Sequence, residues 1–105
     1  MRRFGVKYPP PPLMGAFILK LLSKKPMHGY QITEELNKIL DMEIPRQIVY
    51  FALKKLESFG FLESRWVLEG GSKPRRMYSI TDEGRKFLEM QIRYLKKLIS
   101  LLEKF

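Results

Sequence analysis

Residues 46–81 read RQIVYFALKKLESFGFLESRWVLEGGSKPRRMYSIT, and this stretch decides the fold. Its first part repeats apolar residues at helical spacing from Pro45 to Phe59, and Gly60 is a favoured C-terminal cap. Two strand-like segments, residues 61–69 and 76–80, flank a turn rich in glycine. The stretch therefore predicts a helix followed by a β-hairpin.

The helix predicted at residues 45–59 has one polar side. Its apolar residues (Ile48, Val49, Ala52, Leu53, Leu56 and Phe59) project together at helical periodicity. The opposite side carries Arg46, Gln47, Tyr50 and Lys54. Arg can pair with guanine, Gln with adenine, and Lys or Tyr can reach phosphate. A polar helix face is most often only exposed to solvent. The hairpin that follows decides between that interpretation and a DNA-binding face.

The predicted hairpin turn is basic. It runs from Gly70 to Arg76 and holds Lys73, Pro74, Arg75 and Arg76 at or beside its tip. The glycines give the turn freedom and the proline stiffens it, which suits contact with the DNA backbone. The alternative is a solubilising loop. A polar helix followed directly by a basic hairpin indicates a winged helix-turn-helix.

The remaining segments complete this architecture. We expect helices at residues 13–23 and 27–40, with Tyr30, Ile32, Leu36, Ile39 and Leu40 buried, and a last helix from Thr81 as N-cap to about Lys104. Four consecutive prolines predict an extended, basic arm at residues 1–12, either a loose tail or an extension that contacts phosphate or the partner subunit. The predicted fold is mostly α with a small β-hairpin: an arm (1–12), a winged helix DNA-binding domain (13–81) and a C-terminal dimerisation helix (82–105).

Two helices carry more apolar surface than one small core should cover. The helix at 13–23 is apolar almost all round, and the last helix has two stripes at heptad-like spacing. We therefore predict a homodimer. The predicted interface residues are Phe17, Leu21, Leu88, Ile92, Leu95, Ile99 and Leu102. The cations of the last helix leave a membrane-surface helix as the alternative.

Composition narrows the function classes. The formal net charge is +9 and the pI about 9.9, which favours a polyanionic partner. The chain has no cysteine and one histidine, so disulfides and zinc fingers are excluded. His28 lacks a nucleophile or metal partners, and we expect it to satisfy a free amide at a helix start. No motif indicates an enzyme, a metal or a cofactor.

The N-terminus superficially resembles a signal peptide. Its apolar run (13–22) is separated from Arg2 and Arg3 by prolines and is interrupted by Lys20. We therefore predict a cytoplasmic protein with no membrane partner. We also expect two aromatic residues, Phe51 and Trp66, to pack within the fold.

Three segments resemble the PadR family of winged-helix transcription regulators. They are residues 28–32 (HGYQI), 49–64 (VYFALKKLESFGFLES) and 74–84 (PRRMYSITDEG), and the likeness covers about residues 13–88. The resemblance implies that Tyr50 and Lys54 lie on the recognition helix and that Pro74, Arg75 and Arg76 belong to the wing. A single C-terminal helix is similar to the family's short subfamily, which dimerises through it.

Two departures from the family pattern limit what the resemblance implies. Gln47-Ile48 stands where the family has Gly-Thr, and Phe51 stands where it has Pro, so a DNA sequence preference does not transfer. Some short members bind planar hydrophobic compounds in the dimer interface. The last helix here has no Trp for stacking, so the residues do not support a small-molecule effector.

We thus expect a homodimeric, sequence-specific regulator of transcription that binds double-stranded DNA at a pseudo-palindromic operator. A repressor is favoured because no activation module is visible. A non-specific architectural DNA-binding protein, an RNA-binding module and a membrane-surface module remain as alternatives.

Overall fold

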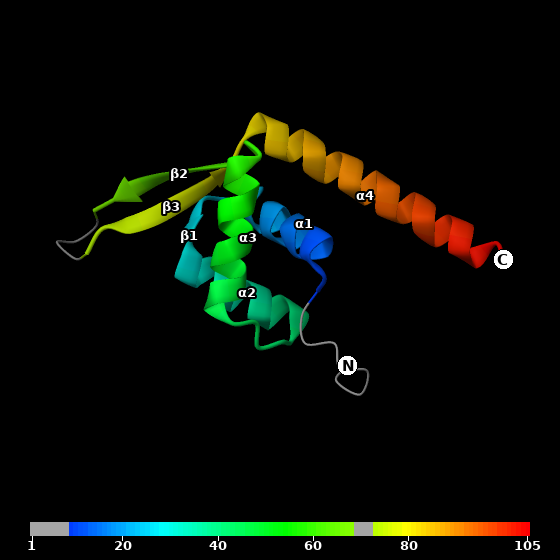
Figure 1. Cartoon of the computed structure of the whole chain (residues 1–105), viewed down its shortest axis with the longest axis horizontal. Helices are drawn as coiled ribbons and strands as arrows, with labels where there is room; N and C mark the ends of the chain where they lie inside the picture. Colours follow the sequence, from blue (N-terminus) through cyan, green and yellow to red (C-terminus); the bar gives the residue numbers. More distant parts are fainter. Residues whose placement is uncertain (1–8, 69–72) are drawn as a thin grey trace.

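The computed structural model describes residues 9–68 and 73–105. Within them the elements follow in the order α1 (Pro11–Leu22), β1 (Met27–His28), α2 (Gly29–Leu40), α3 (Arg46–Ser58), β2 (Leu62–Val67), β3 (Arg75–Ile80) and α4 (Asp82–Glu103) (Figure 1). The predicted mostly α fold with a hairpin is confirmed. Residues 1–8 of the predicted arm, and Gly70, Gly71 and Ser72 of the predicted turn, lie outside the described residues.

The sheet has one strand that the sequence did not predict. Its order is β1-β3-β2, and both pairs are antiparallel. Met27 pairs with Tyr78 and His28 with Met77, where a helical start was expected. A strand of two residues is too short to leave a periodic pattern, so only its partner strand reveals it. β1 ties the start of α2 to the wing.

The first helix is covered mainly by its own chain. Met14, Ile18, Leu19, Leu21 and Leu22 are buried, because α2, α3, α4 and β3 all pack against α1. Phe17 of the same helix stays exposed, so the expectation that a second subunit covers the rest of α1 stays a prediction.

The proline run of the predicted arm also needs correction. α1 begins at Pro11, so two of the four prolines occupy its first turn and are not extended. The first helical turn has no need of the amide hydrogens that proline lacks, which makes it the one part of a helix that accepts proline.

Two short connections set the direction of α3. Asn37 spans the α2–α3 loop: its Oδ1 accepts from the Ile44 amide at 2.7 Å and its Nδ2 donates to the Ile44 carbonyl at 3.3 Å. At the other end, Gly60 adopts a φ of 82°. The Phe61 amide then donates to the Leu56 carbonyl at 3.0 Å, which closes the helix as the predicted glycine cap requires.

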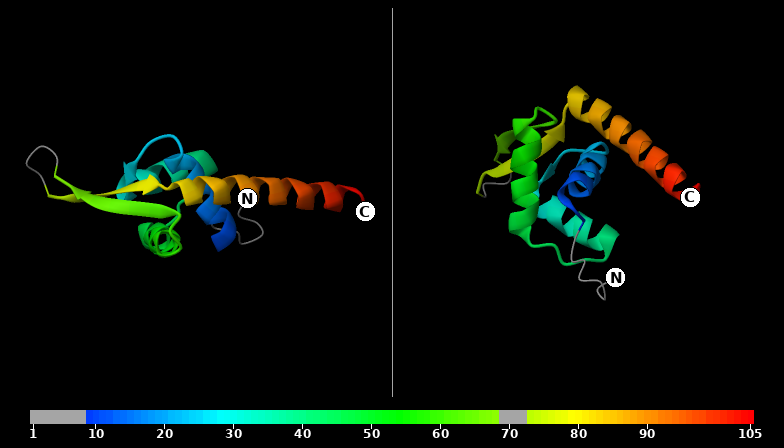
Figure 2. Two further views of the ribbon diagram at one scale, coloured as in Figure 1. Left: turned by 90° about the horizontal axis from the view of Figure 1, so that it is seen from above. Right: turned by 45° about the vertical axis from the view of Figure 1, so that its right-hand side comes forward.

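The N-cap of α4 fixes this helix to the body. Thr81 Oγ1 accepts from the Gly84 amide at 3.0 Å, as predicted, and donates to the Gly60 carbonyl at 2.7 Å. Gly84 is needed because an added Cβ would lie 2.1 Å from the Phe61 carbonyl oxygen. From this anchor α4 leaves the body on the side opposite the hairpin, as the two views of Figure 2 show. None of the helices in residues 9–68 and 73–105 is long and apolar enough to cross a membrane.

Candidate nucleic-acid interface

The polar side predicted for α3 is exposed to solvent. Arg46, Gln47, Tyr50 and Lys54 are all exposed, while Val49, Leu53 and Leu56 on the other side are buried. The guanidinium carbon of Arg46 lies 5.3 Å from the centre of the Tyr30 ring, a cation–π contact. Tyr30 was expected in the core, but it is about half exposed and extends this polar surface onto α2.

Tyr50 owes its position to a glycine. A Cβ added to Gly29 would lie 2.5 Å from Tyr50 Cε1, so the tyrosine ring rests directly on the backbone at the start of α2. Since β1 holds this backbone against β3, the same contact relates α3 to the wing. A larger residue at position 29 would force the Tyr50 ring away.

Two of the wing cations contact other parts of the chain. Lys73, Pro74 and Arg75 are exposed, and Arg75 also contacts His28. Arg76, although exposed, is engaged with its own chain: Nε donates to Ser64 Oγ at 2.8 Å, and Nη2 lies 3.8 Å from Glu57 Oε2. Its guanidinium carbon also lies 5.4 Å from the centre of the Trp66 ring. Arg76 therefore joins the wing to α3.

Trp66 is 65% exposed, so the prediction that it packs within the fold is wrong. It lies directly opposite Arg76 in the β2–β3 register. A side chain in this position presents an aromatic face beside the wing cations.

Between α2, α3 and the wing lies a concave surface of about 450 Å³. Among the residues that the structure describes, its lining has no carboxylate and consists of His28, Gly29, Tyr30, Tyr50, Trp66, Pro74, Arg75, Arg76 and Tyr78. We call it the basic cleft. Burial, the largest influence, raises the pKa of Tyr78 above its ordinary value, so its phenol stays protonated at neutral pH. Hydroxyls, cations and an imidazole thus line one hollow, and most of them can donate hydrogen bonds.

His28 occupies the back of this cleft. Its Nδ1 accepts from the Gln31 amide at 3.2 Å, which confirms the prediction that it caps a helix. Its Nε2 lies 2.8 Å from Nη1 of Arg75, a residue 47 positions away in the sequence. The second contact has no local signal and was not predicted.

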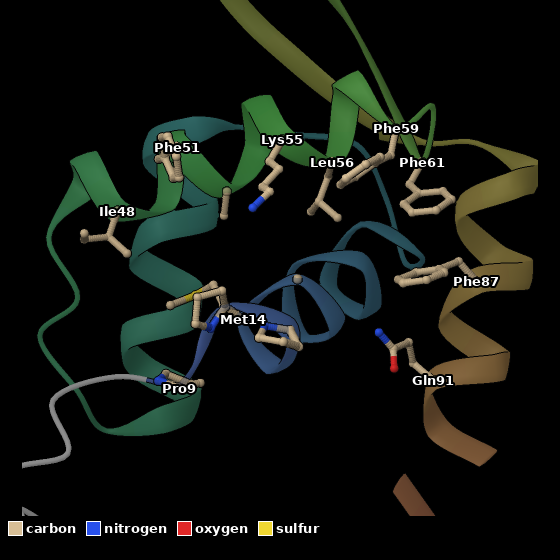
Figure 3. A pocket seen from close by; sticks show the side chains of 14 residues that line it. Pro9, Met14, Ile48, Phe51, Lys55, Leu56, Phe59, Phe61, Phe87 and Gln91 are labelled. Atoms are coloured by element: carbon tan, nitrogen blue, oxygen red, sulfur yellow. The ribbon is translucent and has the colours of Figure 1, made fainter. Parts of the chain in front are cut away.

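A second concave surface lies on the other side of α3. This apolar groove, of about 550 Å³, is bordered by α1, α3 and α4. Among its lining are Phe51, Phe59, Phe61 and Phe87, and the last two stack with ring centroids 4.2 Å apart. Lys55 and Gln91 extend into it as polar groups (Figure 3). Phe51 is 69% exposed, so the prediction that it packs is wrong.

The predicted dimer residues fall into two sets. Leu21 and Leu88 are buried in the core of their own chain, which removes them from the predicted interface. Ile92 and Leu95 are partly exposed, whereas Phe17, Ile99 and Leu102 are exposed. No cluster of three or more residues with metal-binding side chains occurs in the part of the chain that the structure describes.

The sequence model of the Transcriptional regulator PadR-like family matches residues 18–90. The chain belongs to the PadR family. Members of this family are transcriptional regulators, so the chain is a regulator of transcription and not an enzyme.

Individual relatives extend over different lengths. An uncharacterized HTH-type transcriptional regulator from Methanocaldococcus jannaschii is 37% identical over 83 residues, which are 79% of this chain and 77% of that protein. The negative transcriptional regulator PadR of Bacillus subtilis is 36% identical over 75 residues, 68% of this chain and 40% of that protein.

The fold of the same Bacillus subtilis protein is known in a complex with operator DNA. That structure has a TM-score of 0.70 and 30% identity, over 76% of this chain and 46% of that one. This chain therefore spans less than half of that PadR, and the match supports a shared winged helix fold over the aligned part.

Proposed function

We propose that this PadR-family protein binds duplex DNA with α3 in the major groove and the wing along the neighbouring backbone. The observation that carries this proposal is the shared exposure of Arg46, Gln47, Tyr50 and Lys54 on one face of α3, beside a cleft without carboxylates. Arg and Gln can form bidentate pairs with bases in the major groove, while wing cations suit phosphates. The solved operator complex of the Bacillus subtilis relative supports the same use of this fold.

The exposed face of α4 supports a homodimer. Its distal half leaves several large apolar side chains uncovered: Tyr94, Leu98, Ile99, Leu101, Leu102 and Phe105. The same helix lines the apolar groove with Phe87 and Gln91, so groove and helix face form one continuous surface. A second copy would cover both. Of the interface residues expected from the sequence, Phe17, Ile92, Leu95, Ile99 and Leu102 remain in this proposal.

A two-fold dimer would place two recognition helices on one side of the duplex. The bound site would then be pseudo-palindromic, with half-sites about one helical turn apart. We favour repression, because one relative is a negative regulator of transcription. The proposed place of action is the cytoplasm, with the chromosome.

Selection of bound duplexes from a random library tests the proposal. The expected result is a recurring site with two-fold symmetry. Enrichment of duplex without a common site would favour an architectural protein. Better competition by structured RNA than by the selected duplex would favour the RNA-binding alternative.

A further inference from the structure

The contacts of His28 cannot all be hydrogen bonds at once. A neutral imidazole has one N–H donor and one acceptor nitrogen. Nδ1 accepts from the Gln31 amide, whose hydrogen is fixed by the backbone, so the ring proton lies on Nε2. Arg75 offers only donors, and its Nη1 lies 2.8 Å from that same Nε2. With the cap formed, two N–H groups face each other without an acceptor between them.

The other ring tautomer only moves the conflict. With the proton on Nδ1, Nε2 accepts from Arg75, but the Gln31 amide then loses its cap. A doubly protonated ring accepts from neither group. The free protein therefore satisfies either the α2 cap or the wing contact.

An anion in the cleft would remove this conflict. One oxyanion beside Nε2 and Nη1 accepts from both donors while Nδ1 keeps the α2 cap. The surroundings suit it, since the phenols of Tyr50 and Tyr78 also line the cleft and none of its described lining residues is a carboxylate. Hydrogen bonds from charged donors to phosphate are short and strong.

We propose that His28 Nε2–H and Arg75 together bind one backbone phosphate of duplex DNA in each subunit. The inference rests on the proposed DNA binding and adds a neutral donor outside α3 to it. His28 then links two functions, because the tautomer that caps α2 is also the one that donates to DNA. Arg75 exchanges a contact with the histidine for a contact with the phosphate.

The test uses a substitution that keeps the cap. Asn is a favoured N-cap, so His28→Asn retains an acceptor for the Gln31 amide but is too short to replace Nε2–H. Its thermal midpoint should stay close to that of the wild type. Affinity for the selected duplex should fall about tenfold or more, since each subunit loses a hydrogen bond to a charged group.

The salt dependence separates the two donors. A neutral histidine releases no counterion, so His28→Asn should leave the slope of log affinity against log salt unchanged. Arg75→Gln should make the slope shallower by roughly 2 for a dimer, about 0.9 for each phosphate. Arg65→Gln is the matched control: Arg65 is an exposed cation of the same hairpin that does not line the basic cleft, and its loss should change the slope less.

A double substitution tests whether the two residues share one phosphate. His28→Asn with Arg75→Gln should then lose less than the product of the two single losses. Strictly multiplicative losses would overturn a shared phosphate. A His28→Asn variant that binds the selected duplex like the wild type would overturn the inference, while the wild type's own binding would still support the proposed function.

NMR of the histidine ring adds an independent readout. In the complex with duplex, the ring should carry its proton on Nε2; a proton on Nδ1 would overturn the proposal. Titration with inorganic phosphate alone should give only weak, millimolar shifts of the Gln31 amide. Saturation at micromolar phosphate would instead assign the cleft to a free phosphate ligand and overturn the assignment to the DNA backbone.

Discussion

The basic cleft and the apolar groove lie on two sides of the same helix and are of similar size, about 450 and 550 Å³. Neighbouring residues separate them: Tyr50 lines the cleft, and Phe51 lines the groove. Cations, phenols and an imidazole line the cleft, whereas aromatic rings and other apolar side chains line most of the groove. We therefore propose a different partner for each surface, an anionic duplex on one side and a second copy on the other.

The largest effect should come from charging the apolar side. Leu102 is 69% exposed in the single chain, so Leu102→Glu should leave the monomer folded. In the proposed dimer it places an unpaired charge at two symmetric positions, and each such burial costs about 3–5 kcal/mol. Sedimentation equilibrium should show a monomer at micromolar concentration.

The control for that variant is Ser100→Glu. Ser100 projects away from both apolar stripes of α4 and receives the same charge. It should remain dimeric. Dissociation of both variants to the same extent would contradict the proposed interface and indicate a general effect of charge on α4.

Next in size is a change at the joint that directs α4. Gly84→Ala places a Cβ against the Phe61 backbone carbonyl, which cannot move aside as a side chain can. We expect a loss of about 2–3 kcal/mol in the free energy of unfolding, as for overpacking in a core. Urea denaturation measures it. A free energy of unfolding within about 0.5 kcal/mol of the wild type would contradict a close contact between Gly84 and the Phe61 carbonyl.

In the proposed complex, the polar side of α3 provides the DNA sequence specificity. Arg46→Ala or Gln47→Ala should cost about 1–3 kcal/mol on the selected site if a bidentate base contact is lost. The same changes should matter less on random duplex. Fluorescence anisotropy with both DNAs gives the ratio, and equal losses on the two would favour an architectural protein.

The smallest effects should distinguish two adjacent residues. Phe51→Ala should weaken self-association by about 1–2 kcal/mol and leave monomer stability nearly unchanged, since the ring is mostly exposed. Tyr50→Ala should instead weaken DNA binding and leave self-association intact. Parallel sedimentation and anisotropy titrations check both. A variant that impairs both activities equally would contradict the assignment of separate surfaces to DNA binding and self-association.

Local signals account for what the sequence predicted well. Periodicity and caps located α3 and α4, because Gly60 and Thr81 act on backbone groups within a few residues. The polar side of α3 followed from the same periodicity. These features need no knowledge of the rest of the chain.

What the sequence did not predict depends on distant contacts. β1 exists through β3, and the cover of α1 comes from four other elements. Tyr30 was expected on the buried face of its helix, yet it is about half exposed and lies beside Arg46. The contact of His28 with Arg75 joins segments that only the folded sheet brings together. The position of Trp66 opposite Arg76 likewise follows from the register of β2 with β3.

The dependence of DNA affinity on salt tests the central claim most directly. If Lys54, Lys73, Arg75 and other cations of two subunits neutralise about 6–10 phosphates, log affinity should fall with log salt at a slope of roughly −5 to −9. The measurement needs only the intact protein and the selected duplex across a salt series. A slope in that range is the predicted result, and a slope near zero would contradict DNA binding through the basic cleft and the wing.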